Sequence, residues 1–147
     1  MGLRTTTWLE RLGRFGLAAI FLFAAVPKIL DPSGFAEDVA HYALLPDAAV
    51  NVVAVLLPWI EAVGALALLT GFAAEGGLLL ANLLLLLFLG ALGQAWARGL
   101  DIDCGCFGHG KGNASVALAF LRDVLFFLLA GGVLALRIRR LRLSAEG

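Results

Sequence analysis

Two cysteines one residue apart are the residues best suited to chemistry in this chain. Cys104 and Cys106 are its only cysteines, and they stand in the glycine-rich stretch DIDCGCFGHG. Thiolate is the nucleophilic form of cysteine, and nearby positive charge such as that of Lys111 favours it. A disulfide across a single glycine closes a small ring of unrelaxed geometry, and strained disulfides exchange readily. The spacing therefore favours thiol–disulfide exchange with another dithiol.

Three other roles for the cysteine pair stay open. A structural disulfide here would close almost no loop, so its chain-entropy benefit would be small. Cys104, Cys106 and His109 offer three metal ligands, but only Asp101 or Asp103 is available as a fourth. Two inert thiols in a turn are the third alternative. We expect catalytic cysteines, and no metal.

The elements that must position this pair are apolar. The chain is 61% hydrophobic, against roughly 45–50% in soluble domains. Its apolar blocks, each about as long as a helix that crosses a bilayer, cover about residues 12–30, 48–69, 76–97 and 116–136. We therefore predict an all-α integral membrane protein, a four-transmembrane-helix bundle in which residues 1–147 form a single membrane domain.

The first apolar block has a second interpretation. Arg4, Arg11 and Arg14 followed by FGLAAIFLFAAV resemble a cleavable signal peptide. No clear cleavage site follows, however, and PKILDP is typical of a helix end. We expect the block to be a span.

Charge distribution predicts the orientation. Eleven basic and eleven acidic residues cancel, so the chain offers no net field for a nucleic acid. Seven lysines or arginines, including the RIRRLR cluster, fall on the side of the two termini, and four fall on the other side. Because positive residues stay in the cytoplasm, both termini should be cytoplasmic. The cysteine segment should then face the periplasm or the cell exterior, where disulfides persist.

The first outer link is too polar to span and too apolar for a plain linker. Phe35, Val39 and Tyr42 recur at helical spacing in it. We expect a short interfacial helix over the bundle, with an irregular surface loop as the alternative.

Charged residues inside the spans are the remaining candidates, because such residues are costly in lipid and are usually functional or paired. Glu61 lies about 20 Å from the outer face by helix rise and Arg122 about 9 Å, so a direct pair between them would need a register shift or a long reach. Arg14 is the other candidate partner for Glu61. Arg122 and Asp123 point about 100° apart, so we expect each to find a separate partner. These charges either lock helices together, or Lys28 and Arg122 polarise a thiolate or quinone oxygen while Glu61 handles protons.

Several motifs together resemble those of the MauE/DoxX family of redox-associated membrane proteins, on the methylamine utilisation side. They are LGRFGLAAIFLFAAVPKILDP, LLPWIEAVGALALLTG, DIDCGCFG and the LRD of the last span, and the likeness runs from about Arg11 to Val133. The resemblance implies a multi-pass protein of the bacterial inner membrane that helps a periplasmic partner to mature. In the methylamine branch that partner is the disulfide-rich small subunit of methylamine dehydrogenase, assisted by a thioredoxin-like periplasmic protein.

The resemblance also implies residue roles. Cys104 and Cys106 are the implied redox pair. The implied framework or proton-handling residues are Glu61, Lys28, Arg122 and Asp123. The chain would be a thiol–disulfide oxidoreductase or a subunit of a quinone-linked one, with quinone as the candidate cofactor. Two other classes stay open: a non-catalytic membrane assembly or chaperone subunit, and a small transporter that uses Glu61.

Overall fold

All regular structure in the described part of the chain is helical. The computed structural model describes residues 3–99 and 116–145. The candidate cysteines, His109 and Lys111 therefore lie outside the described residues. The helices are α1 (Leu3–Leu30), α2 (Pro32–His41), α3 (Asp47–Thr70), α4 (Ala74–Ala97) and α5 (Val116–Ala145).

Four of these helices are long and apolar enough to cross a membrane, which confirms the predicted fold class. Two extend beyond their predicted spans, because α1 begins at Leu3 instead of near residue 12, and α5 runs on to Ala145. At about 1.5 Å per residue, α5 is about 45 Å long, more than a hydrocarbon core needs. Their polar ends stay helical because they pack against each other, as the ion pairs of Glu10 with Arg137 and Arg140 show.

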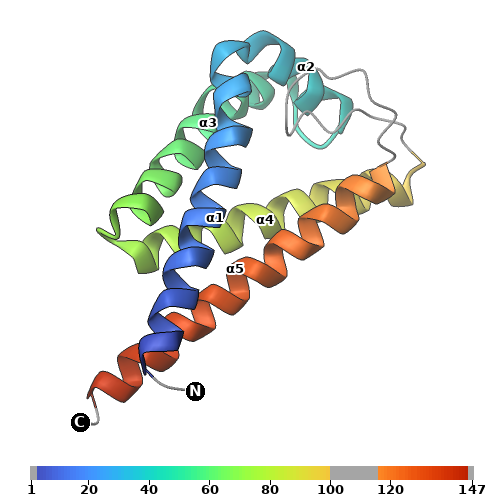
Figure 1. The fold of residues 1–147 in the computed structure, drawn as a ribbon. Coiled ribbons are helices and arrows are strands. Elements are labelled where there is room, and N and C mark those ends of the chain that lie inside the picture. The colour runs from blue at the N-terminus through green and yellow to red at the C-terminus, as the bar shows by residue number, and fades with distance from the viewer. Residues whose placement is uncertain (1–2, 100–115, 146–147) are drawn as a thin grey trace.

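The long helices form two pairs that cross at an angle (Figure 1). Helix α1 packs on α3, and α4 packs on α5, while α1 also contacts α5. The main core cluster lies at the crossing and includes Leu17, Leu68, Leu78 and Ala130, each fully buried. The start of α1 and the end of α5 lie together at one end, and the pairs diverge toward the other end, where α2 lies.

Helix α2 is the short helix expected in the first outer link. Asp31 caps its start by accepting a hydrogen bond from the Gly34 amide at 3.0 Å, and Pro32 stands at its first position. Phe35 on α2 is buried and faces the bundle. The prediction of a helix over residues Phe35 to Tyr42 is therefore confirmed, although Tyr42 itself is the C-terminal cap.

The opposite end of the bundle carries the tight turn between α3 and α4. Gly71 ends α3 with a φ of 75°, a left-handed conformation that suits glycine. The Arg14 guanidinium lies directly against it, since a Cβ built on Gly71 would stand 2.9 Å from Arg14 Nη2. The turn therefore leaves room for an arginine side chain from α1.

Candidate functional site

A buried ion pair between α1 and α3 lies at the centre of the candidate site. Lys28 Nζ donates to both carboxylate oxygens of Glu61, at 2.8 Å and 3.0 Å. Only 3% of Lys28 and none of Glu61 is exposed. Two charges so completely removed from water are tolerable only because each satisfies the other. Glu61 therefore pairs with Lys28, and the two candidate partners, Arg14 and Arg122, were the wrong choice.

Lys28 turns inward because α2 covers the end of α1. A lysine near a helix end normally extends its ammonium toward water. Here the Phe35 ring of α2 lies 5.0 Å from Lys28 Nζ, and the Phe88 ring of α4 lies 5.1 Å from it. Both distances allow a cation–π attraction. The ammonium thus lies against two rings and one carboxylate.

Arg122 and Asp123 pair with each other, which the sequence interpretation excluded. Arg122 Nε and Nη2 both donate to Asp123 Oδ1, at 3.1 Å and 2.9 Å. The prediction that these neighbours cannot pair is wrong, because helix angles place Cα atoms, whereas arginine carries its guanidinium at the end of a long stem that can reach the next residue. Asp123 is 3% exposed, whereas about a third of the Arg122 side chain is exposed.

The four implied framework residues meet at one small cavity. Lys28, Glu61, Arg122 and Asp123 all line a space of about 30 Å³ inside the bundle. That volume is enough for a water molecule. The structure therefore brings together charges from α1, α3 and α5 that lie far apart in the sequence.

A larger apolar cavity adjoins this cluster. It has a volume of about 340 Å³ and lies where the helix pairs diverge, with walls from α2, α3 and α4 that include Phe35, Leu57 and Leu92. Lys28 is the one charged residue among those described that line it. Ligand sites are commonly apolar with a few polar groups, and this volume falls within their range.

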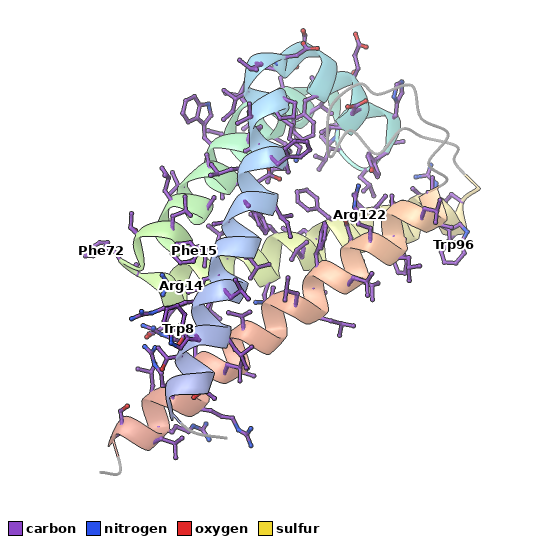
Figure 2. The ribbon with its side chains drawn as sticks, in the orientation of Figure 1. Trp8, Arg14, Phe15, Phe72, Trp96 and Arg122 are labelled. Carbon is purple, nitrogen blue, oxygen red and sulfur yellow. The ribbon has the colours of Figure 1, made fainter. Side chains whose placement is uncertain are left out.

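Sequence reasoning missed a second charge cluster at the opposite end. Glu10 is only 1% exposed. Its two carboxylate oxygens form ion pairs with Arg137 Nη1 at 3.0 Å and Arg140 Nη1 at 2.9 Å. Arg14 lies 3.9 Å from the same carboxylate and donates from Nε to the Leu68 carbonyl at 3.1 Å. The sequence could have indicated part of this cluster, because Glu10 and Arg14 have opposite charges and stand four residues apart, the spacing of ion pairs on one helix face. Figure 2 shows Arg14 on α1 beside the α3–α4 turn and Arg122 on α5, well apart from it.

The end of the bundle that carries α2 is closed by contacts between distant segments. Arg98, which caps α4, donates to the Tyr42 carbonyl at 3.4 Å. Tyr42 also packs on a small core cluster that contains Leu92 of α4 and Val116 of α5. Helix α4 ends and α5 begins at this end, and Cys104 and Cys106 fall between these two helices in the sequence. The cysteines themselves, and the alternative metal ligand His109, lie outside the described residues, so their roles stay predictions.

The chain is similar to methylamine utilisation proteins. A family model described as "Methylamine utilisation protein MauE" matches residues 6–136. The "Methylamine utilization protein MauE" of Paracoccus denitrificans is 37% identical over 118 residues, which cover 80% of this chain and 63% of the relative. The protein of the same name from Methylophilus methylotrophus is 38% identical over 91 residues, which cover 61% of this chain and 48% of the relative. These matches thus span about half to two thirds of the relatives' length, and no solved structure matches significantly.

Proposed function

Since this chain belongs to the methylamine utilisation protein MauE family, we propose that it supports the maturation of a periplasmic partner by thiol–disulfide exchange through Cys104 and Cys106. The partner is a client protein with disulfides, of the methylamine dehydrogenase small-subunit type, or a thioredoxin-like periplasmic protein. The chain lies in the bacterial inner membrane with both termini in the cytoplasm. Its cysteine segment then faces the periplasm.

The contact between Arg98 and Tyr42 carries this proposal. It ties the end of α4 to the segment that follows α2, and Val116 at the start of α5 belongs to the core cluster on which Tyr42 packs, so α4 ends and α5 begins near α2. Four spans with seven basic residues on the side of the termini favour a periplasmic position for this end. Disulfides persist in that compartment.

The exchange is a two-electron transfer. A client thiolate attacks one sulfur of the Cys104–Cys106 disulfide, so a mixed disulfide forms and the other cysteine leaves as thiolate. The second client thiolate then breaks the mixed disulfide. The client gains a disulfide, and the chain is left with two reduced cysteines that an oxidant must restore.

We propose a membrane quinone as that oxidant, and the apolar cavity supports it. Quinone would take two electrons and two protons from the dithiol and become hydroquinone. Lys28 has three donor hydrogens and gives two bonds to Glu61, so one hydrogen remains for an acceptor oxygen. Since Lys28 also lines the larger cavity, it would orient a quinone carbonyl there.

In this proposal the buried pairs form a framework. Glu61 accepts two hydrogen bonds from Lys28, and Asp123 accepts two from Arg122. A proton relay would need one of these carboxylates to leave its partner. The pairs instead hold α1, α3 and α5 at fixed positions around the cavities.

Trapping a mixed disulfide tests the exchange step. In a Cys104→Ser or Cys106→Ser variant the remaining thiolate can still attack a disulfide of an oxidised periplasmic partner. The chain then has no second thiol to break the mixed disulfide that forms, so a covalent adduct should accumulate. The adduct should disappear on reduction and in the double serine variant. Normal disulfide formation in the client with both cysteines replaced would contradict the proposal and favour the assembly or chaperone role.

Thiol labelling tests the orientation. A membrane-impermeant maleimide added to intact, reduced spheroplasts should label Cys104 and Cys106. A matched control places one cysteine at the exposed Ser144 near the end of α5, in a chain that lacks the native cysteines. Ser144→Cys should be labelled only after lysis, and the reverse pattern would overturn the proposed topology.

Filling the apolar cavity tests the quinone step. Ala91 lines the cavity, whereas its neighbour Gly90 is exposed with no atom within 4 Å of a built Cβ. Ala91→Phe should slow reoxidation of the reduced chain by a short-chain ubiquinone, and Gly90→Leu should leave it unchanged. Equal rates in both variants would exclude this cavity as the quinone site.

A further inference from the structure

The turn between α3 and α4 and the start of α1 line a third cavity, away from the end that carries α2. Its volume is about 500 Å³, and Arg11, Arg14, Trp8, Phe15 and Thr70 are among its lining residues. Figure 2 shows Trp8, Arg14, Phe15 and Phe72 gathered at this end of the molecule. The proposed redox function uses none of these residues.

The pocket has excess positive charge. Two arginines line it, and no acidic side chain of the described residues does. The nearest carboxylate, that of Glu10, is already engaged by Arg137 and Arg140 at 3.0 Å and 2.9 Å, closer than the 3.9 Å that separates it from Arg14. Within the described part of the chain, Arg11 has no ion pair. Two guanidinium groups are thus available to one anion.

Arg14 is fixed in place before any ligand arrives. It is 9% exposed, its Nε is bound to the Leu68 carbonyl at 3.1 Å, and its guanidinium lies against Gly71. A preorganised cation loses little side-chain freedom on binding. Arg11, by contrast, is exposed and can close over the anion from the other side.

The surroundings of the two arginines are apolar and exposed. Trp8 is 71% exposed, Leu12 72% and Phe72 85%. Because these residues sit where α1, α3 and α4 end, they lie at the level at which aromatic side chains anchor proteins in the headgroup region. A ligand that matches this arrangement carries an anionic group with hydrocarbon beside it.

We infer that this pocket binds the phosphate of one anionic phospholipid between Arg11 and Arg14, with its acyl chains along Leu12 and Phe15. Basic pockets between transmembrane helices are suited to anionic headgroups, and guanidinium groups give strong charge-assisted hydrogen bonds to phosphate. A lipid with net negative charge is preferred, because the ammonium of a zwitterionic lipid meets two arginines and no carboxylate.

Native mass spectrometry of the full chain in neutral detergent tests this inference, with phosphatidylglycerol or phosphatidylcholine as the probe. The wild type should retain one phosphatidylglycerol and little phosphatidylcholine. Arg11→Gln should weaken retention of phosphatidylglycerol about tenfold, as expected for the loss of a charge-assisted bond, and Arg11→Lys should recover part of it. Because Arg11 is exposed, these variants leave the core intact.

Arg139→Gln is the matched control, since Arg139 is an exposed arginine near the end of α5 and does not line the pocket. It should change retention less than about twofold if the pocket acts specifically. Equal losses in Arg11→Gln and Arg139→Gln would reduce the effect to general surface charge and overturn the inference. Equal retention of phosphatidylcholine, or displacement of the retained phosphatidylglycerol by inorganic phosphate alone, would also overturn it.

Discussion

Replacing Lys28 by methionine should destabilise the protein strongly. Methionine matches the apolar stem of lysine but removes the ammonium, so Glu61 loses both hydrogen bonds while its surroundings stay fully buried. Removing one partner of a buried pair typically costs about 3–5 kcal/mol. Protonation of Glu61 sets an independent upper limit on this cost, because the variant can avoid an unpaired buried charge by binding a proton. Neutralising a glutamate of ordinary pKa near 4.3 at pH 7 costs about 3.7 kcal/mol. Both routes give a loss of about 3–4 kcal/mol.

If Glu61 is protonated in the Lys28→Met variant, the stability that this variant loses depends on pH. Each unit by which pH falls makes the neutral form of Glu61 about 1.4 kcal/mol easier to reach. The gap between Lys28→Met and the wild type should therefore narrow from pH 7 to pH 5. A loss of packing alone would not depend on pH.

Equilibrium unfolding in mixed detergent micelles with increasing dodecyl sulfate measures these free energies. The control is the double variant Lys28→Met with Glu61→Gln, which removes both charges and should recover most of the loss, because buried ion pairs can be replaced by uncharged groups at little cost. The double-mutant cycle then gives a large coupling energy. A cost below about 1 kcal/mol for Lys28→Met, or a double variant no more stable than the single one, would refute the pairing.

Two further substitutions test the packing of α1 on α5 and the second charge cluster. Gly13→Ala should cost about 1–3 kcal/mol in the same unfolding assay, because its Cβ would clash with Val133 Cγ2; Gly16→Ala, with no atom within 4 Å, should be neutral or slightly stabilising, and equal effects would contradict the close approach. Glu10→Gln should cost about 2–4 kcal/mol by leaving Arg14, Arg137 and Arg140 to repel one another, and added salt should reduce that cost. Glu75→Gln is its control and should cost less than about 1 kcal/mol, since Glu75 is exposed and pairs with Arg137 at 3.4 Å; a similar loss in both variants would mean that Glu10 has no special role.

Hydropathy was enough to predict the four spans, because lipid requires every backbone polar group of a span to be satisfied within its own helix, whereas α2 was predicted from the helical spacing of Phe35, Val39 and Tyr42. Apolar length alone then identifies the four spans. Apolar length did not predict the polar ends of α1 and α5, because it detects only apolar segments. They are helical through ion pairs such as Glu10 with Arg137, which join positions far apart in the sequence.

The partners of the buried charges could not be predicted from depth along the helices. Helix rise places Cα atoms, but lysine and arginine carry their charge at the end of a long, flexible stem. Lys28 reaches inward because α2 covers it, and Arg122 folds back to Asp123. Both outcomes depend on tertiary contacts that no spacing rule contains. The residue types were informative, since all four implied framework residues line one cavity.

The two charge clusters bear on the alternative interpretation of the first apolar block as a cleaved signal peptide. Helix α1 supplies Lys28 to Glu61 at one end of the bundle and Glu10 to Arg137 and Arg140 at the other. Without α1, Glu61 would lose Lys28, the donor of both its hydrogen bonds. At the other end, Arg137 and Arg140 would lose Glu10, and only the exposed carboxylate of Glu75 would remain as an ion-pair partner among the described residues. An unpaired charge within a span is costly. The energetics therefore favour α1 as a retained span, and they make it the helix that joins α3 to α5.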